Sequence, residues 1–368
     1  MECLVAYKAI SDKCSQFLFT INDVNYDVKQ IVDKHQFINY SINRYCCHQM
    51  NSTYLSALQF TFSVTSPVFF ILFLGLYLKR TQRINDDFIA IASKLIFNIC
   101  LPILLFLAIV NSQVDLIAQS RLALFSAFAA ILSFLIFWWI APLCTKSPED
   151  KGVAVQSAFR SNLAIIGLAL CTNAFGDAGV TIGALIIAVV TPLYNILSIY
   201  ALTHSLSKNE KLRWDKLILD ITKNPLILAI ALAFVFLYFD WQLPVVLNDT
   251  GVYLSKMTLP LALITIGGSL SLSALQKSSA LSSYVVAAKL IILPVTVTTL
   301  AWCLGFKNIE IVCLALMFGS PTASASFVMV KVIGGNHKLA SNTIAMSTLV
   351  SALTISILLY FLRVFSLI

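Results

Sequence analysis

Long apolar runs follow one another from residue 57 to residue 368, and they constrain the fold more than any other feature. Ten runs can be delimited: 57–78, 88–110, 117–143, 153–174, 178–203, 217–239, 248–272, 279–305, 308–333 and 339–365. Most of them reach the roughly 20 residues that an α-helix needs to cross a bilayer. The short connections leave no room for a soluble catalytic domain. The sequence therefore predicts an all-α polytopic membrane protein with ten transmembrane helices.

Charged residues are too scarce to cover a water-facing surface. They make up 11% of the chain, against about 25% in ordinary soluble domains. The net charge is +8, but no face combines many Lys and Arg residues with interleaved aromatics, as nucleic-acid binding would require. We therefore expect a lipid bilayer around the chain and no nucleic acid as a partner.

Basic residues are distributed unevenly among the loops. The odd-numbered loops contain Lys79, Arg80, Arg83, Lys146, Lys151, Lys208, Lys211, Arg213, Lys216, Lys277 and Lys338. The even-numbered loops and the C-terminal end contain Arg121, Lys307 and Arg363. Because cytoplasmic loops are enriched in Lys and Arg, the odd-numbered loops are expected in the cytoplasm and both termini outside.

Residues 1–56 differ from the rest, because they mix acidic and basic residues and contain no run long enough to span a bilayer. The regions of a signal peptide are also missing. One interpretation is a small accessory element, and the one we favour is that translation begins at Met50. The adjacent Cys46, Cys47 and His48 lack a second ligand pair at metal spacing, so we expect neither a metal site nor a cofactor.

The two halves resemble each other at a nearly constant offset. Four pairs of segments match: 101–104 with 259–262, 158–162 with 317–321, 175–177 with 334–336 and 199–202 with 359–362. Chance similarity among apolar helices is the alternative. The repeat predicts units at 57–203 and 217–368, joined by a cytoplasmic connector at 204–216. Since five helices is an odd number, the second unit enters the membrane inverted, a common plan of transporters.

The fourth and ninth runs are the least lipid-like. The ninth packs small and polar residues into one short stretch, namely Gly319, Ser320, Pro321, Thr322, Ser324 and Ser326. Proline breaks a helix, and a half-helix that begins at such a break directs N–H groups and partial positive charge into a cavity. Asn162 occupies the matching place in the fourth run. These residues favour a site for an anion, and a proline kink packed with small residues is the alternative.

Embedded charges point the same way. Acidic residues lie only in the tail, in loops or near helix ends, whereas Lys289 lies in the middle of the eighth run. Lys94, Lys256 and Lys331 lie within runs, and Arg160 lies near the start of the fourth. Ionised groups inside a membrane are candidates for function, although lysines near helix ends can reach the headgroups instead. A cationic interior without carboxylates would attract a negatively charged cargo.

Several ordered motifs resemble the auxin efflux carrier family, which includes bacterial malonate and organic-acid permeases. The motifs are Gly75 with Lys79-Arg80, Phe97-Asn98-Ile99-Cys100-Leu101-Pro102, Ala158-Phe159-Arg160-Ser161-Asn162, Thr191-Pro192-Leu193-Tyr194-Asn195-Ile196-Leu197-Ser198, Lys223-Asn224-Pro225-Leu226-Ile227-Leu228, Leu259-Pro260-Leu261-Ala262-Leu263 and Ile266-Gly267-Gly268-Ser269-Leu270. The resemblance covers 57–365. It implies two inverted five-helix repeats, a scaffold part, a moving transport part, and a crossover of broken helices 4 and 9 around the substrate. The sequence departs from the family pattern at one place, because proline occurs only in the ninth helix and Asn162 stands in the fourth.

Together these observations predict a secondary transporter of small organic anions that works by alternating access, in a bacterial inner membrane. The expected substrate-binding residues are Asn162, Ser320, Pro321, Thr322, Ser324, Asn98, Asn195 and Lys289. Asn98 and Asn195 enter the set through the resemblance, which also permits a homodimer. A proton or sodium is the expected coupling ion. The alternatives are a sodium-coupled symporter on the related bile-acid-transporter plan and a membrane sensor that moves nothing. No catalytic arrangement is visible, so an enzyme is not expected.

Overall fold

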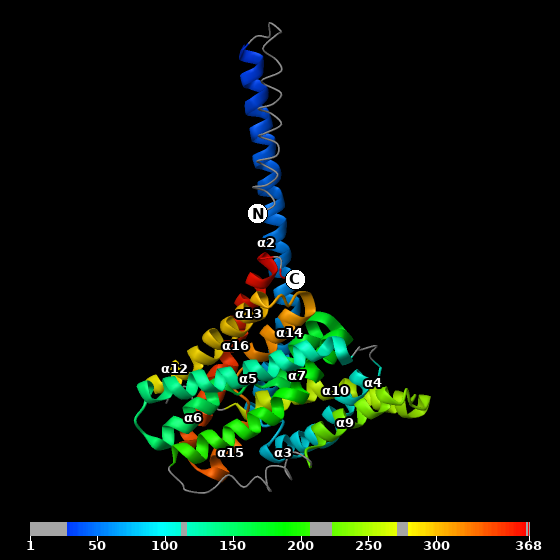
Figure 1. Cartoon of the computed structure of the whole chain (residues 1–368), viewed down its shortest axis with the longest axis vertical. Coiled ribbons are helices and arrows are strands. Elements are labelled where there is room, and N and C mark those ends of the chain that lie inside the picture. Colours follow the sequence, from blue (N-terminus) through cyan, green and yellow to red (C-terminus); the bar gives the residue numbers. More distant parts are fainter. Residues whose placement is uncertain (1–27, 112–115, 207–222, 271–278, 366, 368) are drawn as a thin grey trace. The chain divides into compact units, whose positions relative to one another are not determined.

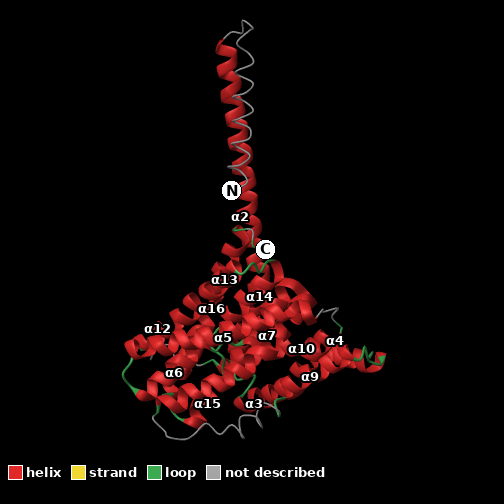
Figure 2. Cartoon of the chain, in the orientation of Figure 1, coloured by secondary structure: helices red, strands yellow, loops and turns green. Residues whose placement is uncertain are grey.

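The computed structural model describes residues 28–111, 116–206, 223–270, 279–365 and 367, with the backbone alone at 28–53 and 116–118. All elements in these ranges are helical (Figure 2). They are α2 (Val28–Arg80), α3 (Asp86–Leu95), η1 (Ile96–Cys100), α4 (Leu101–Val110), α5 (Leu116–Cys144), α6 (Pro148–Phe159), η2 (Leu163–Gly167), α7 (Leu168–Ser205), α9 (Pro225–Tyr238), α10 (Val245–Ser269), α12 (Ala280–Ala287), η3 (Ala288–Ile292), α13 (Leu293–Cys303), α14 (Asn308–Gly319), α15 (Ala325–Ile333) and α16 (His337–Val364), where η marks a π-helical turn. The all-α prediction is confirmed.

The chain forms two compact units, residues 1–59 and 60–368. The described part of the first unit belongs to α2, and the site lies wholly in the second unit. Most of the predicted connector 204–216 and the loop that contains Lys277 fall outside the described residues.

Seven described stretches are long and apolar enough to cross a bilayer: Tyr54–Arg80, Asp86–Val110, Gln119–Cys144, Leu163–Ser205, Val245–Ser269, Ala280–Cys303 and His337–Val364. The chain is thus an integral membrane protein. One of these stretches combines parts of the fourth and fifth predicted helices, because α7 continues through Gly176, which takes a left-handed φ of 56° and kinks the helix. Two further apolar helices, α9 and α14, are shorter.

Helices α2 and α10 cross with their backbones in direct contact. A Cβ atom added at Gly267 would overlap the carbonyl oxygen of Leu72, and one added at Gly75 would overlap that of Ile264. Small residues allow this close approach between helices in a membrane. The motifs that contain these glycines therefore have a packing role.

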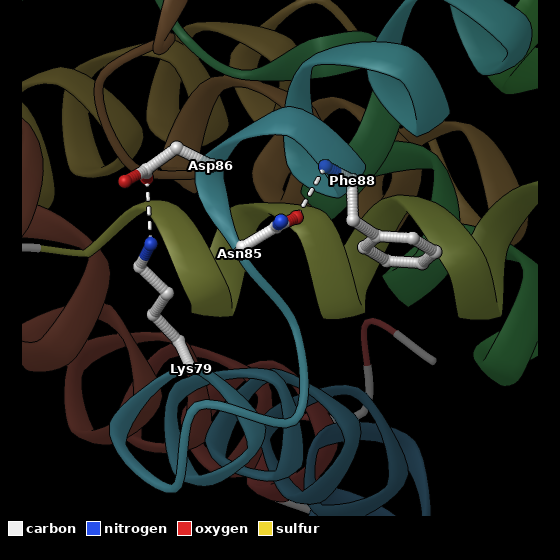
Figure 3. A network of polar contacts seen from close by, with 4 residues as sticks. All are labelled: Lys79, Asn85, Asp86 and Phe88. Carbon is white, nitrogen blue, oxygen red and sulfur yellow. Dashed lines mark hydrogen bonds and ion pairs between the residues drawn. The ribbon is translucent and has the colours of Figure 1, made fainter.

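The turn that joins α2 to α3 is fixed by two polar contacts (Figure 3). Asn85 caps α3 by accepting a hydrogen bond from the backbone N–H of Phe88 at 2.8 Å, and Lys79 pairs with Asp86 at 2.7 Å. A capping side chain replaces one of the bonds that a helix start lacks. This basic turn is the first odd-numbered loop.

Two helices of 12 residues, α6 and α14, are the most deeply buried. Each is about 18 Å long, which is too short for the roughly 30 Å hydrocarbon core of a bilayer. Figure 1 shows α6 beside α15, and the two helices are in contact. Because α6 is followed by η2 and α14 is followed by α15, each pair reads as one helix interrupted in the middle.

Candidate functional site

The two interruptions meet. Residues 160–162 follow α6 and residues 320–324 follow α14, and we call these two segments together the crossover. Ser161 and Thr322 form an antiparallel bridge, flanked by bonds from Asn162 N to Pro321 O at 2.8 Å and from Ala323 N to Arg160 O at 3.1 Å. The backbone N–H and C=O groups of the two segments thus provide hydrogen-bond partners for each other. Irregular backbone is tolerated inside a membrane when its polar groups are satisfied in this way.

The two interruptions arise in different ways. Pro321 has no N–H to donate and disrupts the preceding helical turn, which explains the end of α14. The first interruption contains no proline, and there the chain is turned out of the helix at Arg160, which has extended backbone angles (φ −79°, ψ 100°). The crossover therefore contains both interruptions, although only the second contains the expected proline.

Hydroxyl groups donate hydrogen bonds to carbonyl groups at the ends of the two short helices. Thr322 Oγ1 donates to Ser157 O at 2.8 Å, Ser320 Oγ donates to Met317 O at 2.8 Å, and Ser161 Oγ donates to Phe318 O at 3.0 Å. A helix leaves its final carbonyls without partners of its own, so these hydroxyls complete the helix ends. The side chains of Ser320 and Thr322 therefore stabilise the crossover through these hydrogen bonds.

A cavity of about 300 Å³ lies against the crossover. It has the size of a small ligand site. Four of the residues predicted to bind substrate line it together: Asn98, Asn162, Asn195 and Ser324. The other four, Ser320, Pro321, Thr322 and Lys289, are buried and are not among its lining residues. The structure thus separates the predicted set into residues of the cavity and residues behind it.

Arg160 also lines this cavity, and its side chain is 7% exposed. Its Nη1 donates to Tyr194 O and to Ser198 Oγ, both at 3.1 Å, and its Nη2 donates to Asn195 Oδ1 at 2.8 Å. A guanidinium has five N–H donors, so two remain without an acceptor in the described part of the chain. Every acceptor is neutral, and none of the buried side chains in that part is an Asp or Glu.

Two helix starts border the same cavity. Leu163 and Ala164 begin η2, which continues into α7, and Ala325 begins α15; all three line the cavity. Neither preceding residue, Asn162 or Ser324, caps its helix with a side-chain hydrogen bond. The first N–H groups of a helix lack partners within it and favour anions. The cavity thus combines a buried cation with two positive helix ends.

Lys289 is fully buried, which rules out the alternative that it reaches the headgroups. It lies in η3, and its ammonium donates to Ser161 Oγ and, at 2.9 Å, to Phe318 O. Lys94, Lys256 and Lys331, by contrast, are exposed. The sequence marks Arg160 as an embedded charge but does not place it in the predicted binding set; its position directly before the interruption is the signal that points to the cavity.

A second cavity, of about 870 Å³, is lined mainly by apolar residues of α2, α4, α7 and α10. Its polar lining includes Asn111, Gln119, Asn173, Asp177 and Lys256. No pattern noted in the sequence predicts this cavity. It is the larger cavity, yet its charged lining residues Asp177 and Lys256 are exposed. The smaller cavity is the better candidate for an anion, because the described residues give its buried Arg160 no carboxylate partner.

Metal chemistry has no visible support in the described part of the chain, where no group of three His, Cys, Asp or Glu residues is placed to hold an ion. The side chains of Cys46, Cys47 and His48 lie outside that part.

Comparison with known proteins gives one family and several distant relatives. A family model described as membrane transport protein matches residues 61–359. "Uncharacterized transporter YfdV" of Escherichia coli K12 is 21% identical over 307 residues, which cover 82% of this chain and 97% of that protein. "Putative malonate transporter" of Rhizobium meliloti is 24% identical over 306 residues, covering 81% and 94%. "Uncharacterized transporter MJ1031" of Methanocaldococcus jannaschii is 23% identical over 300 residues, covering 79% and 95%.

Proposed function

The chain belongs to the membrane transport protein family of the auxin efflux carriers, and we propose that it carries small organic anions across the membrane by alternating access. The proposed substrates are carboxylates, either malonate-like acids or auxin-like compounds. The name of the relative from Rhizobium meliloti refers to malonate, which supports the first class. The proposed location is a bacterial plasma membrane.

The observation that carries the proposal is the environment of Arg160. Its guanidinium is buried, it faces only neutral acceptors, and two of its donors have no partner in the described residues. Burying an uncompensated charge is costly. A carboxylate in the cavity would supply the missing charge, and its two oxygens match the planar guanidinium fork. Asn98, Asn162 and the start of α15 would complete its hydrogen bonds.

The arrangement of the two cavities supports alternating access. Both lie along η2 and α7: the smaller reaches Ala164, and the larger begins at Ala169. Five residues of helix correspond to roughly 8 Å, so a short barrier separates them. Buried Ile165, Ile166 and Leu168 occupy it. We infer that movement of the helices on one side of this barrier opens one cavity and closes the other.

The crossover supports the inverted repeat. An antiparallel bridge between Ser161 and Thr322 means that the chain runs in opposite directions through the two interruptions. Equivalent helices of inverted units cross a membrane in opposite directions. On this basis we propose ten crossings in two inverted five-helix units, 57–203 and 217–368.

Loop charge then assigns a side to each cavity. The smaller cavity includes Asn224 and Pro225, which follow the basic connector 204–216. The larger includes Asn111 and Asp177, which belong to even-numbered loops. By the excess of Lys and Arg in cytoplasmic loops, the smaller cavity faces the cytoplasm and the larger faces outside.

Equilibrium binding to the purified protein tests the proposal. The panel contains malonate, succinate, other small carboxylates and indole acetate, with neutral amides of the same shape as controls. We expect at least one acid to bind, its amide not to bind, and Arg160→Gln to weaken binding at least tenfold. Lys94→Gln is the matched control, because it removes one positive charge from an exposed lysine outside the cavity. Binding of no acid by folded protein, or equal binding by the Arg160 variant, contradicts the proposal.

A further inference from the structure

The ammonium of Lys289 is hydrogen-bonded to the crossover, although Lys289 does not line the smaller cavity. It donates to Ser161 Oγ, in the first interruption, and to Phe318 O, at the end of α14, at 2.9 Å. Ser161 Oγ in turn donates to the same Phe318 carbonyl at 3.0 Å. The three groups form a closed triangle that joins η3, α14 and the crossover.

The acceptors of Lys289 are the kind of ligands that a sodium ion takes. A hydroxyl oxygen and a carbonyl oxygen are neutral, and the end of a helix adds partial negative charge. In transporters with interrupted helices, unwound carbonyls and half-helix C-termini coordinate the coupling sodium ion. The protonated lysine brings the same single positive charge to such a place, attached to the chain.

No carboxylate competes for this ammonium in the described residues. The elements packed against η3 are α6, α12, α13, α14 and α16. Their charged groups lie at helix ends away from Phe318, namely Glu149, Asp150, Lys151, Glu310, His337, Lys338 and Arg363. Glu310, for example, is eight residues from Phe318 on α14, or about 12 Å along the helix. Lys289 is therefore held by oxygen dipoles rather than by an ion pair.

We propose that the Lys289 ammonium is a built-in cation, which occupies the place where a sodium-coupled transporter of this architecture would bind sodium. The crossover then needs no sodium to hold its shape. Lys289 acts as a positioning residue: it fixes Ser161, whose neighbours Arg160 and Asn162 line the cavity, and it does not touch the substrate. This inference goes beyond the proposed function, because it concerns the crossover whether or not an anion is bound.

The test measures thermal unfolding of the full-length protein in detergent, with sodium chloride replaced stepwise by choline chloride at constant total salt. Lys289→Ala and Lys289→Ser remove the ammonium and leave room for an ion, and serine also adds an oxygen ligand. Lys289→Met is the matched control, because it removes the charge but fills the space. All four proteins are purified in parallel in each salt.

We expect wild type to unfold at the same temperature in both salts. The Ala and Ser variants should unfold earlier than wild type in choline and should gain stability with the logarithm of sodium concentration, as for any ligand that binds the folded state. If these variants can be recovered as monodisperse protein in sodium chloride but not in choline chloride, that result supports the proposal equally. The Met variant should show no sodium effect.

Three results would overturn the proposal: a saturable rise of the wild-type Tm with sodium, Ala and Ser variants that respond to sodium no differently from wild type or fail to be recovered in both salts, or a sodium effect in the Met variant. None of these measurements uses a transported anion. A failure here therefore leaves substrate binding at Arg160 standing, and a failure of the proposed function leaves this result standing.

Discussion

Ser161 and Thr322 bridge the two halves of the chain, and each reaches across to satisfy the other half's helix end. Ser161 Oγ donates to Phe318 O at 3.0 Å and Thr322 Oγ1 donates to Ser157 O at 2.8 Å, while their backbones form an antiparallel bridge. Both side chains are buried. The two hydroxyls at the centre of the crossover are thus used within it, and the polar lining of the smaller cavity comes from Ser161 together with its neighbours Arg160 and Asn162.

The bond of Thr322 predicts a cost in stability. Thr322→Val keeps the shape of the side chain but leaves the buried Ser157 carbonyl without this donor, which should lower the free energy of unfolding by about 1–3 kcal/mol. Thr296→Val is the control, because Thr296 is only partly buried and its hydroxyl donates to the carbonyl of Ile292, one turn earlier in the chain; its effect should stay within about 0.5 kcal/mol. Thermal unfolding of both variants checks this. Equal effects would mean that the crossover bond contributes nothing.

Asn195 positions Arg160, which predicts a strong effect of a nearly isosteric change. Asn195→Asp places a carboxylate at the oxygen that accepts from Nη2 at 2.8 Å. The resulting ion pair would neutralise the guanidinium, so we expect the affinity for the anion to fall at least tenfold with little loss of stability. Asn308→Asp, at an exposed helix start outside the cavity, should bind normally. Tighter anion binding by Asn195→Asp would contradict the assignment of Arg160 as the anion's partner.

The contact between α2 and α10 predicts sensitivity to a single methyl group. Gly267→Ala would force Cβ into the Leu72 carbonyl oxygen, and overpacking of this kind costs about 1–3 kcal/mol. At Gly251 the nearest atom to an added Cβ is the end of the flexible Leu107 side chain, at 2.9 Å. We therefore expect Gly251→Ala to be tolerated, and the two Tm values to differ by several degrees. Similar Tm values for the two variants would show that α2 and α10 separate without cost.

The assignment of the two cavities to opposite sides predicts opposite accessibility. In a cysteine-free background, Asn111→Cys should react with a membrane-impermeant maleimide in intact cells, and Asn224→Cys should react only in inverted vesicles. Asn111 is exposed and lines the larger cavity, and Asn224 lines the smaller. Labelling of both from one side, or the reverse pattern, would contradict the orientation derived from loop charge.

The sequence was sufficient for the helices and for one of the two interruptions. Apolar runs mark helices in lipid because the bilayer fixes their length, and Pro321 marks an interruption because it lacks a donor. The interruption at Arg160 could be inferred only by comparison with the other half, since its cause is the pairing with Pro321 and Ala323 across the crossover. Such long-range pairing leaves no local pattern in the sequence.

The site was predicted less completely, because the sequence does not reveal which way side chains point. Asn98, Asn162, Asn195 and Ser324 meet at one cavity as expected, but Ser320 and Thr322 turn to helix carbonyls. Lys289 is fully buried, as its position in the middle of a run suggested. Its ammonium, however, bonds to the crossover, and Lys289 does not line the cavity. Asn98 and Lys289 both lie in π-helical turns, η1 and η3. Such a turn changes the direction in which side chains point from the helix, and α-helical periodicity does not predict that change.

Solute counterflow into proteoliposomes measures directly whether the protein carries an anion across the membrane and whether Arg160 is needed for it. Vesicles loaded with an unlabelled acid that binds the protein are diluted into the labelled acid, without any ion gradient. We expect transient accumulation of label by wild type and by Lys94→Gln. The rate should be at least tenfold lower for Arg160→Lys, which keeps the charge but loses the planar fork, and lower still for Arg160→Gln. Absence of counterflow for every acid that binds, or undiminished counterflow by Arg160→Gln, would contradict it.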